Sequence, residues 1–347
     1  MKRVQWLDIA KFFFILIVIY SHLESAVDEF SCLIVPIMLP GFLFASGYAH
    51  RSGQDFKSFF IKKFRTLFVP WLILSVFDIS LSQIASFGEH NYLYELGWNF
   101  LQIRGRNDQL WFVAALFTAY IPFYFYIEWY KRKSSNGNYR TAVFFLIALA
   151  FFGCGIAYSL FMDPALLPWG SISLPWHLDY SFRAVFFMAC GYFFREKVEN
   201  WFDAFPSAVR TVFLLSLHAV IVYAPYFITI HDNIFALLAN LITPLLGIFS
   251  VVSISKALPA NRYFLYVGQN TRLYFAFHGK VYGVIEGILR QFFAAPYYAL
   301  LSNKISAVLF AVALTILVSF ILIIPCYIVN RWFPFILGKK KPDRVQV

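Results

Sequence analysis

The sequence has little charge for its length. Only 14% of its 347 residues are Asp, Glu, Lys or Arg, and 60% are hydrophobic, whereas a soluble domain carries about 25% charged residues. The mean hydropathy is accordingly high, at +0.66. This scarcity of charge excludes an ordinary soluble domain and indicates a chain that lies largely in lipid.

Cysteine motifs are also missing. The four cysteines, Cys32, Cys154, Cys190 and Cys326, lie far apart and form no CxxC or other metal-ligand spacing. This pattern argues against a zinc site or a disulfide framework, so we expect no metal. No repeat or low-complexity stretch occurs either, and the longest gap between apolar runs is 87–108. We therefore predict a single membrane domain over residues 1–347.

A nucleic-acid partner is not expected, although the net charge is +11. The cations lie in short loops between apolar runs and do not form a basic face interleaved with stacking aromatic residues on a soluble domain. This distribution of charge is instead typical of a membrane protein with basic loops. The main partner of the chain is therefore expected to be the lipid bilayer.

Long apolar runs predict the fold. About 20 apolar residues in a helix cross the ~30 Å of bilayer hydrocarbon, and ten runs of roughly this kind can be counted. We therefore predict an all-α, polytopic membrane helix bundle of about ten transmembrane helices. The predicted spans are 7–26, 32–49, 66–86, 109–129, 142–161, 180–194, 211–230, 234–255, 263–289 and 305–330.

The lysines and arginines predict the orientation of these spans. With the N-terminus inside, 21 of the 29 fall in cytoplasmic segments, four in outward loops and four within spans. Cytoplasmic loops carry such an excess of Lys and Arg, so both termini are expected to face the cytoplasm. The apolar run after Met1 is compatible with a cleavable signal peptide, but the Asp and Glu that follow it favour a retained first span.

The first span carries a charged stripe. Asp8 and Lys11 are an i,i+3 pair, and Lys11 and His22 are separated by about three full helical turns. Ionisable groups are costly in a bilayer, so this stripe is expected to face the bundle. One alternative is an Asp8–Lys11 ion pair at the helix mouth with His22 reaching the outer interface. The other is a functional stripe with a cation near the cytoplasm and an imidazole near the outside.

Lys11-x10-His22 resembles the Arg/Lys-x10-His signature of the acyltransferase-3 family, which comprises integral membrane O-acyltransferases and includes a fucose 4-O-acetylase-like group. Further segments are similar to family motifs in the expected order. They are PGFLFASGYAHR (40–51), KKFRTLFVPW (62–71), QLWFVAALF (109–117) and VGQNTRLYFAFH (267–278). Two departures stand out: the cation is Lys rather than Arg, and Thr271 stands where the family often has Ser.

The resemblance implies an O-acetyltransferase that uses acetyl-CoA as its acyl donor and a glycan or lipid-linked saccharide as its acceptor. The phosphates of coenzyme A favour a basic site on the cytoplasmic side. The predicted donor-binding residues are Lys11, Ser46, Arg51, Lys62, Lys63 and Arg65. The Lys and Arg of this loop also have a simpler explanation, because they determine topology.

Polar residues of the outer half supply the other candidates. Imidazole has a pKa near neutrality and suits a base for an acceptor hydroxyl. The catalytic candidates are His22, Asp8, Arg183 and His278, and the candidates for substrate binding are Trp111, Asp108 and Asp179. Arg183 is expected inside the bundle, where an i,i+4 pair with Asp179 would neutralise it. Trp111 has an alternative role as a residue of the interfacial aromatic belt. His278 has an alternative role as a packing residue.

Two functions therefore compete. The first is transfer of an acetyl group from cytosolic acetyl-CoA to a hydroxyl of a cell-surface or lipid-linked glycan, at the bacterial inner (plasma) membrane. The second is a transporter or flippase of a lipid-linked saccharide, which would also bury charged residues in its spans. The ordered motifs and the absence of paired Gly/Pro-broken helices favour the transferase. The acceptor sugar, the oligomeric state and the choice between direct transfer and an acyl-histidine are left open by the sequence.

Overall fold

The computed structural model describes residues 3–85, 91–106, 110–132, 137–227 and 233–338. Within these ranges the chain is helical and contains no β-strand. In the described part of the chain, seven helical segments are long and apolar enough to cross a membrane, which confirms the predicted polytopic helix bundle. These segments are Asp28–Tyr48, Phe56–Ile84, Trp111–Arg132, Thr141–Phe161, Ser207–Ala224, Asn240–Ala257 and Lys304–Trp332.

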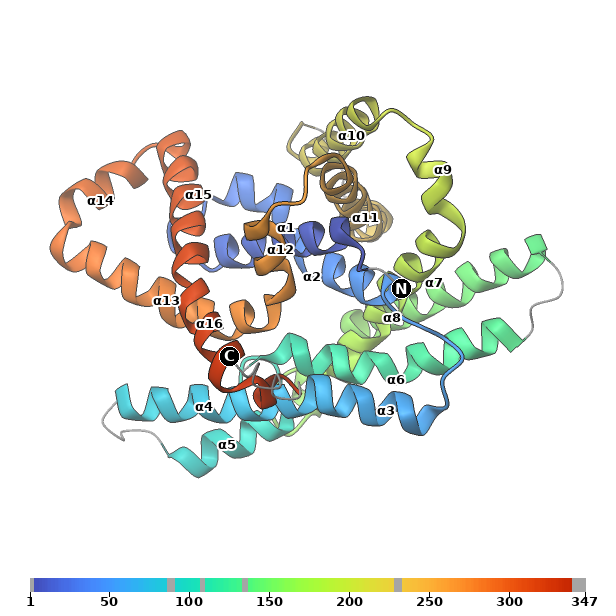
Figure 1. The fold of residues 1–347 in the computed structure, drawn as a ribbon, viewed down its shortest axis with the longest axis horizontal. Coiled ribbons are helices and arrows are strands. Elements are labelled where there is room, and N and C mark those ends of the chain that lie inside the picture. The colour runs from blue at the N-terminus through green and yellow to red at the C-terminus, as the bar shows by residue number, and fades with distance from the viewer. Residues whose placement is uncertain (1–2, 86–90, 107–109, 133–136, 228–232, 339–347) are drawn as a thin grey trace, which may run out of the picture. The chain divides into compact units, whose positions relative to one another are not determined.

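The fold falls into two compact units. Unit 1 comprises Met1–Ala45 and Phe194–Tyr327, and unit 2 comprises Ser46–Phe193 and Ile328–Val347. Figure 1 shows the helices of both, coloured along the chain.

Unit 1 is built around α1 (Gln5–Ser21), which packs against α11, α12, α13 and α15. Apolar side chains surround α1, and Phe14, Ile15 and Ile19 are fully buried, as expected of a helix that is hydrophobic on every side. Its other helices are α2 (Asp28–Tyr48, up to Ala45), η4 (Phe194–Val198), α9 (Glu199–Asp203), α10 (Ser207–Phe227), α11 (Asn233–Ala257), α12 (Arg262–Gln269), α13 (Thr271–Phe292), α14 (Ala294–Leu301), α15 (Lys304–Ile321) and α16 (Ile323–Trp332, up to Tyr327).

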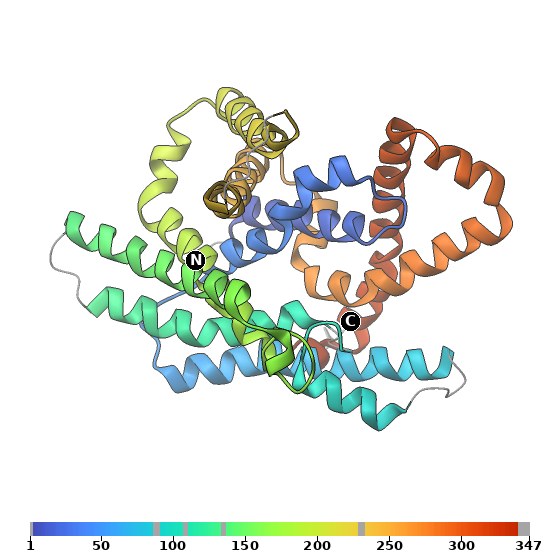
Figure 2. The ribbon, with the colours of Figure 1, turned by 180° about the vertical axis from the view of Figure 1, so that it is seen from behind.

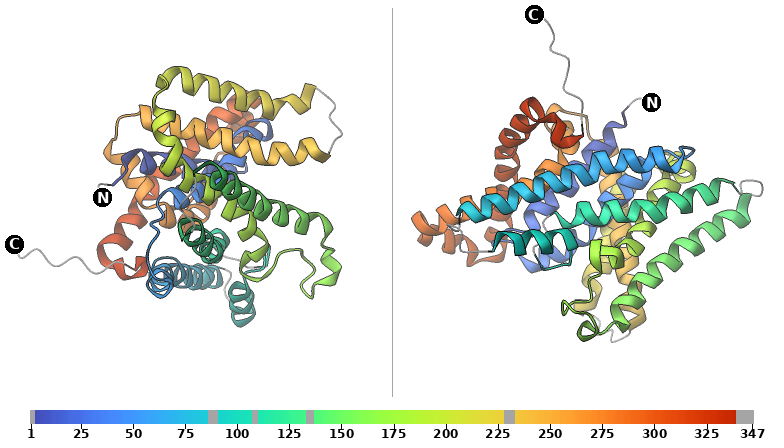
Figure 3. Two further views of the ribbon diagram at one scale, coloured as in Figure 1. Left: turned by 90° about the vertical axis from the view of Figure 1, so that its right-hand side faces the viewer. Right: turned by 90° about the horizontal axis from the view of Figure 1, so that it is seen from below.

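The arrangement of helices α10 to α15 completes unit 1. The long helices α10 and α11 lie side by side (Figure 3, left). The predicted span 263–289 is not one helix, because the chain breaks at Asn270 between α12 and α13. α13, α14 and α15 then follow one another in an open loop of helices (Figure 1).

Unit 2 packs α8 (Leu178–Phe193) against both α6 (Trp111–Arg132) and α7 (Gly137–Phe161), as Figure 2 shows. Its remaining elements are α3 (Phe56–Lys63), η1 (Phe64–Phe68), α4 (Val69–Ala85), α5 (Tyr92–Leu101), η2 (Pro164–Leu166), η3 (Pro175–His177) and η5 (Pro334–Leu337). η1 is a π-helix that joins α3 to α4 without a break, and the three form one rod in the right-hand view of Figure 3.

Several short helices lie where the sequence predicts only loops. α5 occupies part of the gap 87–108, α9 follows the span 180–194, and α14 lies between the last two predicted spans. These helices have 10, 5 and 8 residues, too few to cross a bilayer. They connect the long helices and set the positions of the polar loops.

Candidate functional site

The end of α1 presents a histidine whose ring is oriented by the backbone. His22 caps α1, and its Nδ1 lies 2.7 Å from the carbonyl oxygen of Val18 and 3.3 Å from the hydroxyl of Ser21. A carbonyl oxygen only accepts hydrogen bonds, so Nδ1 carries the proton and the neutral ring keeps its lone pair on Nε2. His22 is exposed, and Nε2 is therefore available as a base or a nucleophile.

His278 lies directly beside His22. The ring centroids are 4.8 Å apart, with the planes at 80°. The Nδ1 of His278 lies 2.9 Å from the carbonyl oxygen of Phe275, so its lone pair is also on Nε2. His278 is buried, and its Nε2 has no hydrogen-bond partner among the described residues. Two residues predicted as catalytic, 256 positions apart in the chain, thus form one imidazole pair in unit 1.

Asp8 forms the predicted ion pair with Lys11. The Oδ1 of Asp8 lies 2.7 Å from the Nζ of Lys11, and its Oδ2 accepts from the Nε of Arg3 at 2.6 Å and from the amide of Gln269 at 3.4 Å. Asp8 and His22 are 14 residues apart along the helix, about 21 Å. Asp8 therefore does not touch His22, and its direct role is to hold Lys11.

A glycine allows α12 to lie directly on the start of α1. A Cβ atom added to Gly268 would come within 1.9 Å of the carbonyl oxygen of Asp8. No side chain fits in that space, so this close approach requires glycine. The approach also brings Gln269, at the end of α12, within reach of the Asp8 carboxylate.

The other predicted donor-binding residues belong to unit 2. Asp55 caps the start of α3, where its carboxylate accepts the backbone N–H of Ser58 at 2.8 Å, and the helix ends with Lys62 and Lys63. Because α3 continues through η1 into α4, these two cations lie within one continuous rod and not at a free helix end. Arg65 follows in η1.

These cations differ in their surroundings. The Nζ of Lys63 lies 3.3 Å from the centroid of the Tyr120 ring, a cation–π contact. The hydroxyl of Tyr120 donates to the carbonyl oxygen of Ser46 at 3.4 Å. The remaining predicted cations of unit 2 are exposed: Arg51, Lys62 and Arg65. Ser46 therefore contributes its backbone to the support of Lys63, whereas the exposed cations present their charge to solvent.

A second cluster of unit 2 joins two loops. One loop precedes α6 and the other precedes α8. The backbone N–H of Arg104 donates to the hydroxyl of Ser173 at 3.2 Å, and the guanidinium of Arg106 donates to the carbonyl oxygen of Trp169 at 2.9 Å. The indole of Trp169 in turn donates to the carbonyl oxygen of Ser173 at 2.8 Å. These bonds hold the two loops together.

Trp111 forms the centre of an aromatic group at these loops. Its ring lies 5.2 Å from His177 and 5.5 Å from Tyr180, and the guanidinium carbon of Arg104 lies 4.7 Å from its centroid. Burial, and to a lesser extent the charge of Arg104, lower the pKa of His177 to about 3. His177 is therefore neutral near pH 7 and poorly suited to act as a general base.

Among the described residues of this region, four that are not glycine have a left-handed backbone. They are Gln102, Leu110, Trp176 and His177, with φ between 51° and 58°. Residues other than glycine rarely adopt this conformation, and it persists only where the surrounding structure enforces it. The loops are thus held in a defined and strained shape.

The predicted pair of Asp179 and Arg183 is not formed. The Oδ1 of Asp179 accepts the backbone N–H of Leu174 at 2.9 Å. Arg183 instead donates to the carbonyl oxygen of Gly155 at 3.1 Å and to the hydroxyl of Ser159. The pairing was predicted wrongly because α7 comes close at Gly155 and offers oxygens that the i,i+4 spacing cannot reveal. Asp108 lies outside the described residues.

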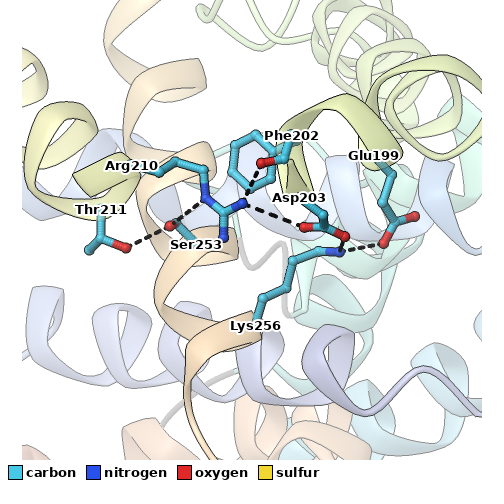
Figure 4. A network of polar contacts seen from close by, with 7 residues as sticks. All are labelled: Glu199, Phe202, Asp203, Arg210, Thr211, Ser253 and Lys256. Carbon is cyan, nitrogen blue, oxygen red and sulfur yellow. Dashed lines mark hydrogen bonds and ion pairs between the residues drawn. The ribbon is translucent and has the colours of Figure 1, made fainter. Parts of the chain in front are cut away.

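Two inner-loop cations form an ion network in unit 1 (Figure 4). The Nζ of Lys256 lies 2.7 Å from Glu199 and 2.7 Å from Asp203, and Arg210 lies 3.5 Å from Asp203. Arg210 also donates to the hydroxyl of Ser253 at 2.9 Å and to the carbonyl oxygen of Phe202. Two cations face two carboxylates, so the network carries no excess charge and braces α9 against α10 and α11.

Glu286 is a buried carboxyl group that the sequence analysis overlooked. It is 1% exposed, its Oε2 lies 3.4 Å from the backbone nitrogen of Glu24, and its Oε1 has no hydrogen-bond partner among the described residues. Glu24 stands two residues after His22. An available signal was the four-residue spacing of His278, Tyr282 and Glu286, which places them along one face of a helix.

Comparison with protein-family models matches residues 4–324 to one described as "Acyltransferase domain", Acyl_transf_3. The match covers nearly the whole chain and includes both units. No curated protein and no solved structure matches the chain.

Proposed function

The chain belongs to the acyltransferase-3 family and is an integral membrane acyltransferase, and from this premise we propose that it transfers an acetyl group from cytosolic acetyl-CoA to a hydroxyl of a cell-surface or lipid-linked glycan. The observation that supports the proposal most is the lone pair of His22 Nε2, which the Val18 carbonyl leaves available beside His278. We place this pair on the outward side, according to the distribution of Lys and Arg.

In the direct mechanism, His22 acts as a general base. Its Nε2 takes the proton of the acceptor hydroxyl while the oxygen attacks the thioester carbonyl carbon. As the tetrahedral intermediate collapses, the carbon–sulfur bond breaks, and the imidazolium returns the proton to the leaving thiolate. The bond from Nδ1 to Val18 keeps the ring in the tautomer that this sequence needs.

The same geometry suits an acyl-histidine route. There Nε2 of His22 attacks the thioester carbonyl carbon first, the carbon–sulfur bond breaks, and coenzyme A leaves as the thiolate. The acceptor hydroxyl oxygen then attacks the acetyl carbon, the bond from that carbon to Nε2 breaks, and the hydroxyl proton passes to the thiolate. In either route His278 contributes a second imidazole, with its lone pair on Nε2 and its ring centroid 4.8 Å from that of His22.

For the donor, the exposed cations Arg51, Lys62 and Arg65 suit the phosphates of coenzyme A best. Lys11 is already engaged by Asp8, so binding a phosphate there requires that it share or exchange its partner. We therefore assign the main electrostatic contribution to the unit 2 cations and a smaller one to Lys11.

The test compares glycans by mass analysis from cells that carry the wild type, a His22→Gln variant or no copy of the gene. The wild type should add the mass of one acetyl group per modified sugar, and His22→Gln should lose this addition at normal protein levels, because glutamine cannot take up a proton. His218→Gln is a matched control, since His218 is a buried histidine that bonds the Leu33 carbonyl.

Acetylation by a well-expressed His22→Gln variant would refute the role of His22. Loss of the glycan from the cell surface in cells without the gene, with no change in acetylation, would instead support the transporter or flippase alternative.

A further inference from the structure

Four cations lie in the loops that we expect to face outward: Arg104, Arg106, Arg290 and Lys304. Positive charge is disfavoured on that side of a membrane protein, so each of these residues needs a reason to be there. Two have an evident one. Arg290 pairs with Glu24 at 2.8 Å, and Lys304 pairs with Glu29.

Arg104 and Arg106 have a different environment. Both are exposed, and no carboxylate of the described residues lies within 4 Å of either guanidinium. Arg104 lies over Trp111 at 4.7 Å, and Arg106 lies over Trp98 at 5.0 Å, measured from the guanidinium carbon to the ring centroid. Within the part of the chain that the structure describes, their charge is positioned by aromatic rings and is not neutralised by a carboxylate; the neighbouring Asp108 lies outside it.

The support for these guanidiniums is firm. The backbone of Arg104 is bonded to Ser173, and the side chain of Arg106 to Trp169. Left-handed residues on both loops show that the backbone is held in shape. Arginines fixed in this way lose little conformational entropy when they bind a ligand.

An arginine fork binds carboxylate or phosphate oxygens in pairs, and a guanidinium that lies over an aromatic ring keeps N–H donors available for them. Arg106 uses one of its donors on the carbonyl oxygen of Trp169 and retains the others. Tryptophan faces beside it offer apolar area against which a flat ring can pack. We propose that Trp98, Arg104, Arg106 and Trp111, here called the outer arginine surface, bind an anionic saccharide, one that carries a carboxylate or phosphate group. This inference rests on the proposed function, since it specifies that the acceptor glycan is acidic.

Binding of a probe saccharide tests the inference. We would reconstitute the full chain in neutral-lipid nanodiscs and measure binding of polygalacturonate, with uncharged dextran as the reference polymer. Wild type should prefer polygalacturonate, and binding should weaken as salt is raised. Arg104→Ala and Arg106→Ala should each lower the affinity about tenfold, and Arg104→Lys should recover part of it because the charge remains.

Arg290→Ala is the matched control, because it removes an outward arginine that already has a carboxylate partner. It should leave binding unchanged. An equal loss in Arg290→Ala, or equal affinity for dextran, would overturn the inference. A second arm replaces neutral lipid by phosphatidylglycerol: if the Arg104 and Arg106 variants change lipid association but not polygalacturonate binding, the surface recognises lipid phosphate and the inference is wrong.

The His22→Gln variant separates this inference from the proposed function. It should bind polygalacturonate like the wild type while transferring no acetyl group. If acetylation is found to depend on His22 but the outer arginine surface binds no acidic saccharide, only the inference fails. If the surface binds and the glycans of the cell are never acetylated, the proposed function fails, and with it the role of the bound saccharide as acceptor, while the binding of an acidic saccharide by this surface stands.

Discussion

The most quantitative prediction concerns the stability of unit 2 at low pH. His177 is fully buried beside Trp111, and burial, followed by the charge of Arg104, lowers its pKa from 6.5 to about 3. Below pH 6.5 the unfolded chain binds a proton at this residue and the folded chain does not. The contribution is therefore fully present above pH 6.5 and is lost as the pH falls toward 3, by about 1.4 kcal/mol per pH unit.

At about pH 5 the loss amounts to roughly 2 kcal/mol. His177→Asn is the informative variant, because an amide does not titrate and asparagine tolerates the left-handed backbone found there. The apparent unfolding temperature of both proteins in a neutral detergent would be followed by tryptophan fluorescence between about pH 7.5 and 5. The wild type should lose more stability than the variant over this range. Equal pH dependence would show that His177 is protonated in the folded protein and would refute the reasoning.

Three further predictions follow from unit 1 and from the orientation. Lys11→Ala should lower the apparent unfolding temperature, because it leaves the buried Asp8 with exposed Arg3 as its main cation. The double variant Asp8→Asn with Lys11→Met should recover much of this loss. An unchanged unfolding temperature in Lys11→Ala would contradict the prediction. Gly268→Ala should greatly reduce the yield of folded protein, since the new Cβ would meet the carbonyl oxygen of Asp8. In Gly287→Ala, nothing lies within 4 Å of the new Cβ, so this variant should be neutral or stabilising by about 0.5–1 kcal/mol. Similar yields of the two variants would count against the close contact at Gly268. Single cysteines at positions 135 and 168 should react with a membrane-impermeant thiol reagent from inside and outside respectively, and the reverse pattern would overturn the assignment of the outward loops.

Local patterns in the sequence were sufficient for part of the fold and of the site. The apolar runs predicted the long helices, because a helix that crosses the bilayer needs apolar side chains along its whole length. The Asp8–Lys11 pair follows from i,i+3 spacing alone and forms as predicted. Hydropathy did not reveal the short helices such as α5 and α14, whose lengths are set by the connections they make.

Contacts between distant segments explain what the sequence could not show. His22 meets His278 only because α13 packs against α1, and the break at Asn270 lets α12 follow a different course from α13. Arg183 finds its oxygens on α7 rather than on its own helix. Such partners depend on which helices become neighbours, which a one-dimensional spacing does not encode.

The π-helix η1 has a consequence for how this family could vary. A π-turn holds one residue more than an α-turn, because its hydrogen bonds run from residue i to i+5. Deleting one residue within Phe64–Phe68 would therefore leave a regular α-helix from α3 into α4 in which Lys62 and Lys63 keep nearly the same direction around the rod axis. The same deletion in the α-helical part of α4 would instead rotate these cations by about 100°. The π-turn is thus a joint at which related chains can lose a residue and still present the basic residues before it in the same direction.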